Sequence, residues 1–351
     1  MRHGIVPPYL LLRLSQLDRD DLRPAVEAAR RALASDLRPR PAPPTVLPAP
    51  TPRPTVPRGP ERTIGDAAGR EVLPGETVRR EGEAPTGDPA VDEAYDGLGA
   101  TYRLFAEAFG RDSIDGAGLP LLATVHYGAD YDNAFWDGGQ MVFGDGDGQV
   151  FGRFTASLSV IGHELAHGVT QYTAALAYQG QSGALNESIS DVFGALVEQH
   201  ALGQSAAEAS WLIGEGLFTD QVEGDALRSM RAPGTAYDDD ILGRDPQPAH
   251  MVDYVETTFD NGGVHLNSGI PNRAFHLAAT QLGGHAWETA GPIWYDTIMG
   301  DLAAEATFSD FAAATAEAAV ARHGTGSPEH LAVREAWSTV GVAIGDTGIG
   351  G

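Results

Sequence analysis

The sequence contains no cysteine, which excludes disulfide bonds and thiol catalysis but leaves the redox compartment open. It also contains no lysine, so all 23 basic residues are arginine, and 48 acidic residues outnumber them. The resulting formal charge of −25 argues against a nucleic-acid partner, because the phosphates would be repelled.

Long hydrophobic runs are absent as well. No stretch approaches the roughly 20 apolar residues that span a membrane, so no membrane partner is expected. An apolar run at 9–12 is interrupted by Arg13, which makes it too short for the hydrophobic region of a secretory signal peptide. With 351 residues, 42% of them hydrophobic, the chain has room for two domains and a large core.

The first sixty residues differ in composition from the rest. Apolar residues at helical spacing predict an amphipathic helix over 18–37, and ten of the 23 prolines fall in 38–60, as in an extended, protease-accessible linker. Ten arginines against five acidic residues give 1–60 a charge of +5 and leave −30 on the remainder. Opposite charges favour docking of the two parts.

The rest of the chain predicts an α+β fold with two lobes. Short apolar runs between turn residues indicate a β-rich N-terminal lobe over 61–175, and helical spacing indicates a mainly α-helical lobe over 176–347. The glycine-rich stretch 144–148 favours a turn, since it lacks the spacing and terminal Glu of an EF-hand. A cleft between the lobes would suit an extended peptide.

Residues 163–167 read H-E-L-A-H within a helical segment. His163 and His167 lie on one face of the helix, and Glu187 in the following helical segment is the candidate third ligand. A catalytic zinc site keeps three protein ligands and leaves a fourth position for water. Glu164 lies about 100° around the helix from His163, where it can reach that water as a general base.

The pentapeptide alone would arise by chance on the order of once in a hundred chains of this length. Asp191, one turn after Glu187, could accept the second N–H of a ligand histidine and fix its tautomer. Because these residues gather on polar faces of otherwise apolar helices, chance is a poor explanation. The sequence therefore predicts one catalytic Zn²⁺ per chain.

Longer segments resemble the thermolysin family of zinc metalloendopeptidases, from about Arg80 to Val342. These segments are YDNAFWDGGQMVFGDGDG (131–148), VIGHELAHGVTQYTAAL (160–176), SGALNESISDVFGALVE (182–198), ALRSM (226–230) and DNGGVHLNSGIPNRA (260–274). The resemblance implies a two-lobed fold with the zinc helix between the lobes, and the two-histidine, one-glutamate ligand set of thermolysin itself.

The resemblance also implies roles for residues outside the zinc site. His265, held by Asp260, and Tyr178 would donate to the oxyanion, while Asn186 and Asp191 would orient the ligand imidazoles. Three further residues would bind the substrate backbone: Arg228 at a carbonyl beyond the scissile bond, and Asn133 and Ala134 along an extended segment.

The implied pocket for the residue after the scissile bond is apolar. Its lining residues would be Phe151, Phe154, Val160, Ile213, Leu217 and Leu227. We therefore expect cleavage on the amino side of Leu, Phe, Ile or Val, by a zinc-activated water with Glu164 as general base and without a covalent intermediate.

The chain departs from the family where thermolysin binds two calcium ions. Of the aligned acidic positions it keeps Glu198 and Glu215, whereas Ser159, Ser210 and Leu212 stand where carboxylates would be needed. Two carboxylates are a small ligand set for Ca²⁺, so we expect the double calcium site to be absent.

The opening IVPPYLLL resembles the Pro-Pro-hydrophobic element of the short propeptides in protealysin-like members of this family. It implies that 1–60 is an inhibitory prosegment, with Pro7, Pro8 and Tyr9 near the active site, removed by cleavage in the linker. The alternative is a flexible tail without an inhibitory role. Family membership implies secretion, whereas the missing signal peptide leaves a cytoplasmic location open.

Two other functional classes fit parts of the pattern. A zinc aminopeptidase also uses H-E-x-x-H with a downstream Glu, but it needs an acidic anchor for a free amino terminus. A non-catalytic zinc-binding protein would bind the metal and hydrolyse nothing. The expected partners are peptide or protein substrates and the chain's own prosegment, and a monomer is expected.

Overall fold

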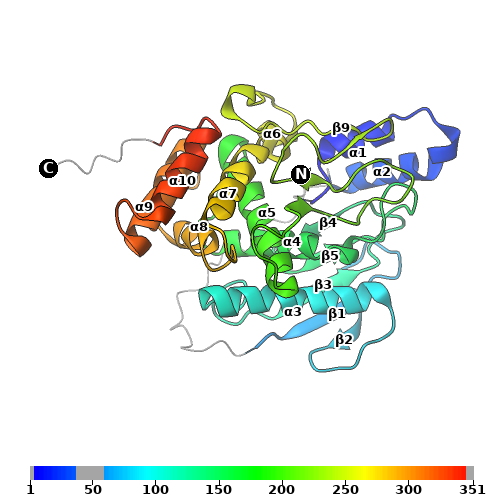
Figure 1. The fold of residues 1–351 in the computed structure, drawn as a ribbon. Coiled ribbons are helices and arrows are strands. Elements are labelled where there is room, and N and C mark those ends of the chain that lie inside the picture. The colour runs from blue at the N-terminus through cyan, green and yellow to red at the C-terminus, as the bar shows by residue number, and fades with distance from the viewer. Residues whose placement is uncertain (1–3, 37–58, 345–351) are drawn as a thin grey trace.

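The computed structural model describes residues 4–36 and 59–344. Its N-terminal lobe is built on a mixed five-stranded sheet (Figure 1). The strands lie in the order β2 (Glu76–Arg80), β1 (Arg62–Asp66), β3 (Leu121–Val125), β5 (Met141–Phe143) and β4 (Ala134–Trp136). The three inner strands are parallel and the two outer strands antiparallel to their neighbours, which leaves the three-residue β4 at one edge.

A long helix, α3 (Pro89–Phe109), packs against this sheet. Asp88 caps its first turn by accepting the N–H of Ala90, and the left-handed Gly110 ends it. The sequence pattern did not predict this helix, because two glycines interrupt it and its buried residues cover most of its circumference. One of them, Gly97, is needed for packing, since a Cβ there would lie 2.3 Å from the Cδ1 atom of Ile161.

Two helices meet at the junction of the lobes, α4 (Leu158–Gln171) and α5 (Gly180–Leu202). A Cβ on Gly162 would lie 3.0 Å from the Cα atom of Gly194, so two facing glycines allow the helices to approach closely. This close approach sets the face of α4 that carries residues 163–167 against the face of α5 that carries Glu187.

The C-terminal lobe is mainly helical, so the predicted α+β class with two lobes is confirmed. Its further helices are α6 (Asp260–Asn267), α7 (Gly269–Leu282), α8 (Ala290–Met299), α9 (Phe308–His323) and α10 (Pro328–Thr339). Between α5 and α6 run two short antiparallel pairs, β6 (Leu212–Ile213) with β7 (Arg228–Ser229), and β8 (Asp238–Asp239) with β9 (Gly243–Arg244). The helix α6 opens with four left-handed residues, 260–263, which set the direction of the chain entering His265.

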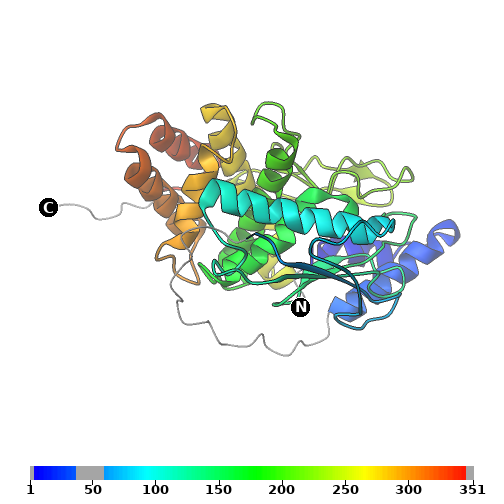
Figure 2. The ribbon, with the colours of Figure 1, turned by 90° about the horizontal axis from the view of Figure 1, so that it is seen from below.

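The N-terminal segment forms α1 (Pro8–Ser15), a 3₁₀ turn at 20–22 and α2 (Arg23–Asp36). The single helix predicted over 18–37 therefore begins later, and α1 was not predicted because eight residues carry too little periodicity. Both helices lie at the end of the molecule opposite α9 and α10 (Figures 1 and 2). The predicted linker lies almost entirely outside the described residues, and no described helix is long and apolar enough to cross a membrane.

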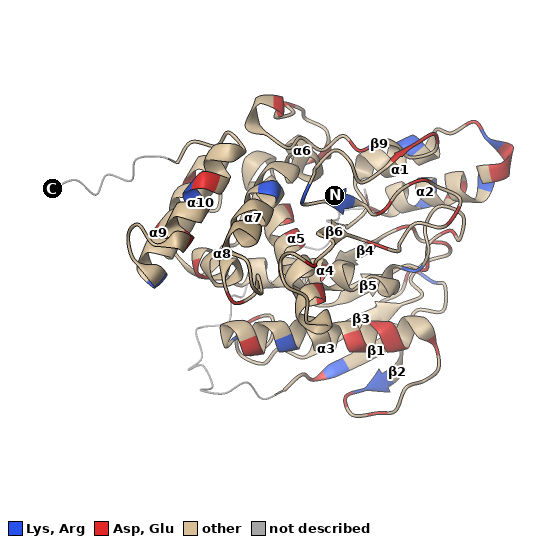
Figure 3. Ribbon diagram, viewed as in Figure 1, with Lys and Arg blue, Asp and Glu red and all other residues tan. Residues whose placement is uncertain are grey.

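Among the described residues, one ion pair joins this segment to the rest of the chain. Figure 3 shows where the basic and acidic residues lie along the ribbon. Arg31 lies 3.0 Å from Asp130 in an exposed ion pair, which is worth at most about 1 kcal/mol. Arg13 donates instead to the carbonyl of Ile241. Apolar burial is the larger contribution, since Ile5, Val6, Leu10, Leu11 and Leu14 are all buried.

Candidate active site

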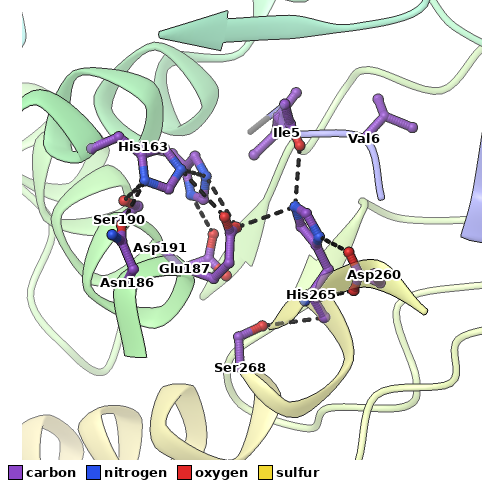
Figure 4. Close-up of polar contacts among 12 residues, drawn as sticks. Ile5, Val6, His163, Asn186, Glu187, Ser190, Asp191, Asp260, His265 and Ser268 are labelled. Carbon is purple, nitrogen blue, oxygen red and sulfur yellow. Dashed lines mark hydrogen bonds and ion pairs between the residues drawn. The ribbon is translucent and has the colours of Figure 1, made fainter. Parts of the chain in front are cut away.

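Three buried side chains converge where α4 meets α5. The Nε2 atoms of His163 and His167 are 3.1 Å apart, and the carboxylate of Glu187 lies 3.5 Å from the first and 3.4 Å from the second. The predicted ligand set is therefore brought together by the fold (Figure 4).

This arrangement fits zinc. Ligand atoms about 2.05 Å from a tetrahedral ion are separated from one another by about 3.3 Å, which agrees with the three distances. Burial lowers the pKa of His163 and of His167 to about 4, so both imidazoles are neutral at pH 7 and can act as ligands. The Oε2 atom of Glu187 is buried without a hydrogen-bond partner among the described residues, as expected for an oxygen that faces a cation.

The other ring nitrogen of His163 contacts Asp191, at 2.7 Å from its Oδ1 atom. Arg228 donates two hydrogen bonds of 2.8 Å to the same carboxylate, and Asn272 donates a third. Although burial opposes ionisation, the charge of Arg228 and the hydrogen bonds from His163 and Arg228 hold the pKa of Asp191 well below its usual range. An ionised Asp191 accepts from the Nδ1–H of His163 and leaves Nε2 available for a metal.

The other ring nitrogen of His167 lies 2.8 Å from the Oδ1 atom of Asn186 and 3.0 Å from the Oγ atom of Ser190. The predicted contact with Asn186 is therefore present in the structure. Ser190 and Asn272 were not predicted. Ser190 could have been found, because it lies one helical turn after Asn186, whereas Asn272 comes from α7 and has no local signal.

On the other side of Glu187 lies His265, whose Nδ1 atom is 2.7 Å from Asp260. Its Nε2 atom is 3.2 Å from the carbonyl oxygen of Gly4, and since both oxygens can only accept, both ring nitrogens donate. Burial lowers the pKa of His265, but the carboxylates of Asp260 and Glu187 outweigh it and raise it to about 9. The hydroxyl of Tyr178 donates to Glu187 and lies 3.4 Å from His265 Nε2.

Glu164 is fully buried on α4 beside the two histidines. Its Oε2 atom accepts the backbone N–H of Trp136, the last residue of β4, at 2.8 Å. This bond ties the position of the carboxylate to the edge of the sheet, a link that the sequence does not reveal.

The cleft along β4 holds a segment of the chain itself. Residues 4–6 lie antiparallel to β4, with the N–H of Ile5 donating to the carbonyl of Ala134 at 3.1 Å and the N–H of Val6 donating to Oδ1 of Asn133 at 2.9 Å. Arg228 donates to the carbonyl of Ile5 at 3.0 Å. The three residues predicted to bind a substrate backbone thus bind this segment.

Pro7, Pro8 and Tyr9 follow directly, where the segment turns into α1. The groups that hydrogen-bond to the predicted site residues belong to Gly4, Ile5 and Val6, directly before these three, and they were not among the predicted contacts. Tyr9 interacts electrostatically with Arg228.

A second contact of the N-terminal segment comes from the last residue of α2. The carboxylate of Asp36 accepts the hydroxyl of Tyr131 at 2.6 Å and the side-chain N–H of Asn133 at 3.1 Å. Asn133 is therefore held from both ends of the segment.

The six predicted pocket residues are all buried. Their elements lie together: the N–H of Leu227 bonds to the carbonyl of Ile213, and Leu217 and Leu227 both lie about 3 Å from a Cβ built on Gly214. The rings of Phe151 and Phe154 are 5.8 Å apart.

At the positions where thermolysin binds calcium, Ser159 donates hydrogen bonds to the carboxyl group of Glu198.

Two family models match consecutive parts of the chain. The thermolysin metallopeptidase catalytic domain matches residues 66–171, and the thermolysin metallopeptidase alpha-helical domain matches residues 174–342.

Two curated proteins and one solved structure that resemble this chain are named as proteases. An extracellular metalloprotease of Pectobacterium carotovorum subsp. carotovorum is 52% identical over 345 residues, 97% of this chain and 96% of the relative. Protease PrtS of Photorhabdus sp. (strain Az29) is 54% identical over 286 residues, 81% of this chain and 76% of the relative. The precursor of protealysin, a metalloproteinase from Serratia proteamaculans, superposes with a TM-score of 0.88 at 51% identity, over 97% of this chain and 100% of that one.

Proposed function

Because the chain belongs to the thermolysin family of metallopeptidases, we propose that it hydrolyses internal peptide bonds on the amino side of hydrophobic residues and is synthesised as a self-inhibited precursor. The observation that carries this proposal is the way residues 4–6 lie along β4, with one carbonyl at His265 and the next at Arg228. An extended peptide substrate would lie in the same way.

The reaction requires a zinc ion held by His163, His167 and Glu187. When bound, zinc lowers the pKa of a coordinated water and polarises the carbonyl to be cleaved. Glu164 takes a proton from the attacking water and delivers it to the leaving amine. The bond from the N–H of Trp136 keeps this carboxylate in place through both transfers.

Two donors stabilise the negative charge that develops on the carbonyl oxygen. His265 donates from Nε2, held in orientation by Asp260, and the hydroxyl of Tyr178 lies close enough to provide a second donor. The charge on His265 strengthens this donation, because a charged donor forms a stronger hydrogen bond to an oxyanion than a neutral one.

The substrate backbone is held by Asn133 and Ala134 on one side and by Arg228 on the other, contacts that do not depend on the substrate's side chains. Selectivity comes from the apolar pocket, whose residues are Phe151, Phe154, Val160, Ile213, Leu217 and Leu227. The complete burial of Ile5, the residue after the carbonyl at His265, supports a preference for a branched apolar residue at this place.

We assign 1–60 to the prosegment and its linker, 61–175 to the N-terminal catalytic lobe and 176–347 to the C-terminal one. Inhibition follows from the prosegment's position, since residues 4–6 use the backbone contacts that a substrate needs. Since the Pectobacterium relative is named as extracellular, we also propose that this protease is secreted.

The test is hydrolysis of a peptide blocked at both ends, with a single Leu in its interior, by zinc-loaded protein lacking 1–60. The expected product begins with Leu, and Glu164→Gln lowers kcat by about 10²–10⁴ while leaving zinc binding intact. An aminopeptidase would spare the blocked peptide, and a non-catalytic protein would bind zinc without cleaving it. Equal resting activity of the full-length and truncated proteins would contradict inhibition by the prosegment.

A further inference from the structure

The prosegment lies in the cleft with a defined register. The carbonyl oxygen of Gly4 is 3.2 Å from Nε2 of His265, the proposed donor to the oxyanion. The next carbonyl, that of Ile5, accepts from Arg228, the proposed contact beyond the scissile bond. With these proposed roles, the peptide bond between the two residues occupies the position of the bond to be cleaved.

The direction of the segment is that of a substrate as well. Gly4 pairs antiparallel with Phe135, and the N–H of Ile5 faces the carbonyl of Ala134. If the segment ran in the opposite direction, the carbonyl at Arg228 would precede the carbonyl at His265 in the chain, and the order that the proposed roles require would be reversed. The observed direction therefore leaves the Gly4–Ile5 bond open to attack.

The residues on either side of the bond suit the site. Ile5 is fully buried and has the branched apolar side chain expected after the scissile bond. A Cβ on Gly4 would lie 2.5 Å from the side-chain nitrogen of Asn133, so a larger residue at this position would displace the side chain of Asn133.

We propose that the bond between Gly4 and Ile5 is a cleavage site for the chain's own active centre. This inference rests on the proposed function. The oxygen of one water molecule bonds to the carbonyl carbon of Gly4, the C–N bond to Ile5 breaks, and a proton of the water passes through Glu164 to the new amine. The products are a four-residue peptide ending in the Gly4 carboxylate and a chain that begins at Ile5.

This cleavage does not release the prosegment. The Val6 bond to Asn133, the Arg228 bond to Ile5 and the docking of α1 and α2 all involve atoms on the product side of the cut. The chain beginning at Ile5 therefore continues to cover the site until the linker is cut. Loss of four residues is expected to precede activation and to leave the resting activity unchanged.

The test follows the intact mass and amino-terminal sequence of the full-length chain, purified with a chelator and then supplied with zinc. We expect a species beginning at Ile5 to appear before the linker is cut, at a rate independent of protein concentration. It should be absent in Glu164→Gln. Ile5→Ala should slow its appearance by at least about tenfold, because the fully buried side chain after the cleaved bond loses three carbon atoms. The matched control Leu12→Ala, on an exposed position of α1, should behave as the wild type.

A linker cut that releases a prosegment still carrying its first four residues would overturn the inference, as would equal trimming of Glu164→Gln. Hydrolysis of an added blocked peptide by the processed sample tests the proposed function separately. An active sample with an uncut Gly4–Ile5 bond overturns only the self-cleavage, whereas a sample that cleaves neither bond overturns both.

Discussion

Asp132 lies directly before Asn133 and is fully buried against a second carboxyl group, Asp147. One oxygen of Asp147 accepts the N–H groups of Gln149 and Val150, and its other oxygen has no hydrogen-bond donor among the described residues. The carboxyl group of Asp132 faces the backbone N–H and the carboxyl group of Asp147. Two ionised carboxylates cannot donate to each other. The pair is satisfied when it shares one proton.

Burial raises the pKa of Asp132 well above its usual range, and the charges of Asp147 and Asp130 raise it further. A folded-state pKa above the unfolded value means that the folded chain holds a proton that the unfolded chain has released. This stabilising contribution is complete below about pH 4 and is lost as the pH rises toward the folded-state pKa, at no more than about 1.4 kcal/mol per pH unit.

The perturbation is Asp132→Asn, which has the same shape and replaces the shared proton with an amide N–H that donates to Asp147. The variant should gain stability relative to the wild type as the pH rises, by as much as about 3 kcal/mol between pH 5 and pH 7. Because a change of 1 kcal/mol moves Tm by about 2–4 °C in domains of 150–250 residues, a difference of several degrees should open across this range.

The assay is thermal unfolding from pH 4.5 to pH 8 in a Glu164→Ala background, which prevents self-digestion. Asp220→Asn, at an exposed position, is the matched control and should leave the pH profile unchanged. Parallel Tm profiles for Asp132→Asn and the wild type would refute the shared proton, and so would a variant that loses stability as the pH rises.

Three other outcomes are expected. Asp36→Ala removes a charged acceptor from Tyr131 and Asn133, each bond worth about 1.5–3 kcal/mol, so the resting activity of the precursor on a small peptide should rise at least about tenfold; an unchanged rate would show that Asp36 contributes nothing to docking. Arg228→Lys keeps the charge but loses the paired geometry at Asp191, and should lower kcat/KM by about tenfold or more; an equal value in the two proteins would contradict this role. A calcium-selective chelator should lower Tm by less than about 2 °C, because Ser159 stands in place of a calcium-binding carboxylate and bonds to Glu198. A large drop in Tm would show that the chain binds a stabilising calcium ion.

The residues whose proximity the sequence predicted are those whose geometry is local to one helix or repeated in a long motif. His163, Glu164 and His167 lie within five positions of α4, and Asn186, Glu187 and Asp191 within six of α5, so helical spacing alone fixes which of them share a face. The two-lobed α+β class followed from equally local patterns: short apolar runs between turn residues in the first lobe and helical spacing in the second.

What the sequence did not predict depends on contacts between distant segments. Gly4 and Ile5 bond to residues more than 200 positions away, His265 and Arg228, and Asp36 reaches Asn133 across 97 positions, so no local pattern reveals these contacts. The helix α3 was missed for a different reason. Its two glycines lower helix propensity, but Gly97 allows close packing against Ile161 of α4 and Gly99 leaves room for the side chain of Arg62 on β1.

The edge strand β4 has only three residues, a length of about 10 Å. A chain that pairs with it must offer free backbone N–H and carbonyl groups over a similar length, and these groups are already paired inside helices and sheets. Folded proteins should therefore resist this protease until a segment opens, so their rates of digestion should follow their local unfolding rather than their content of leucine or phenylalanine. The same requirement shields the enzyme's own helices, including α4 and α5, from neighbouring copies in a concentrated solution.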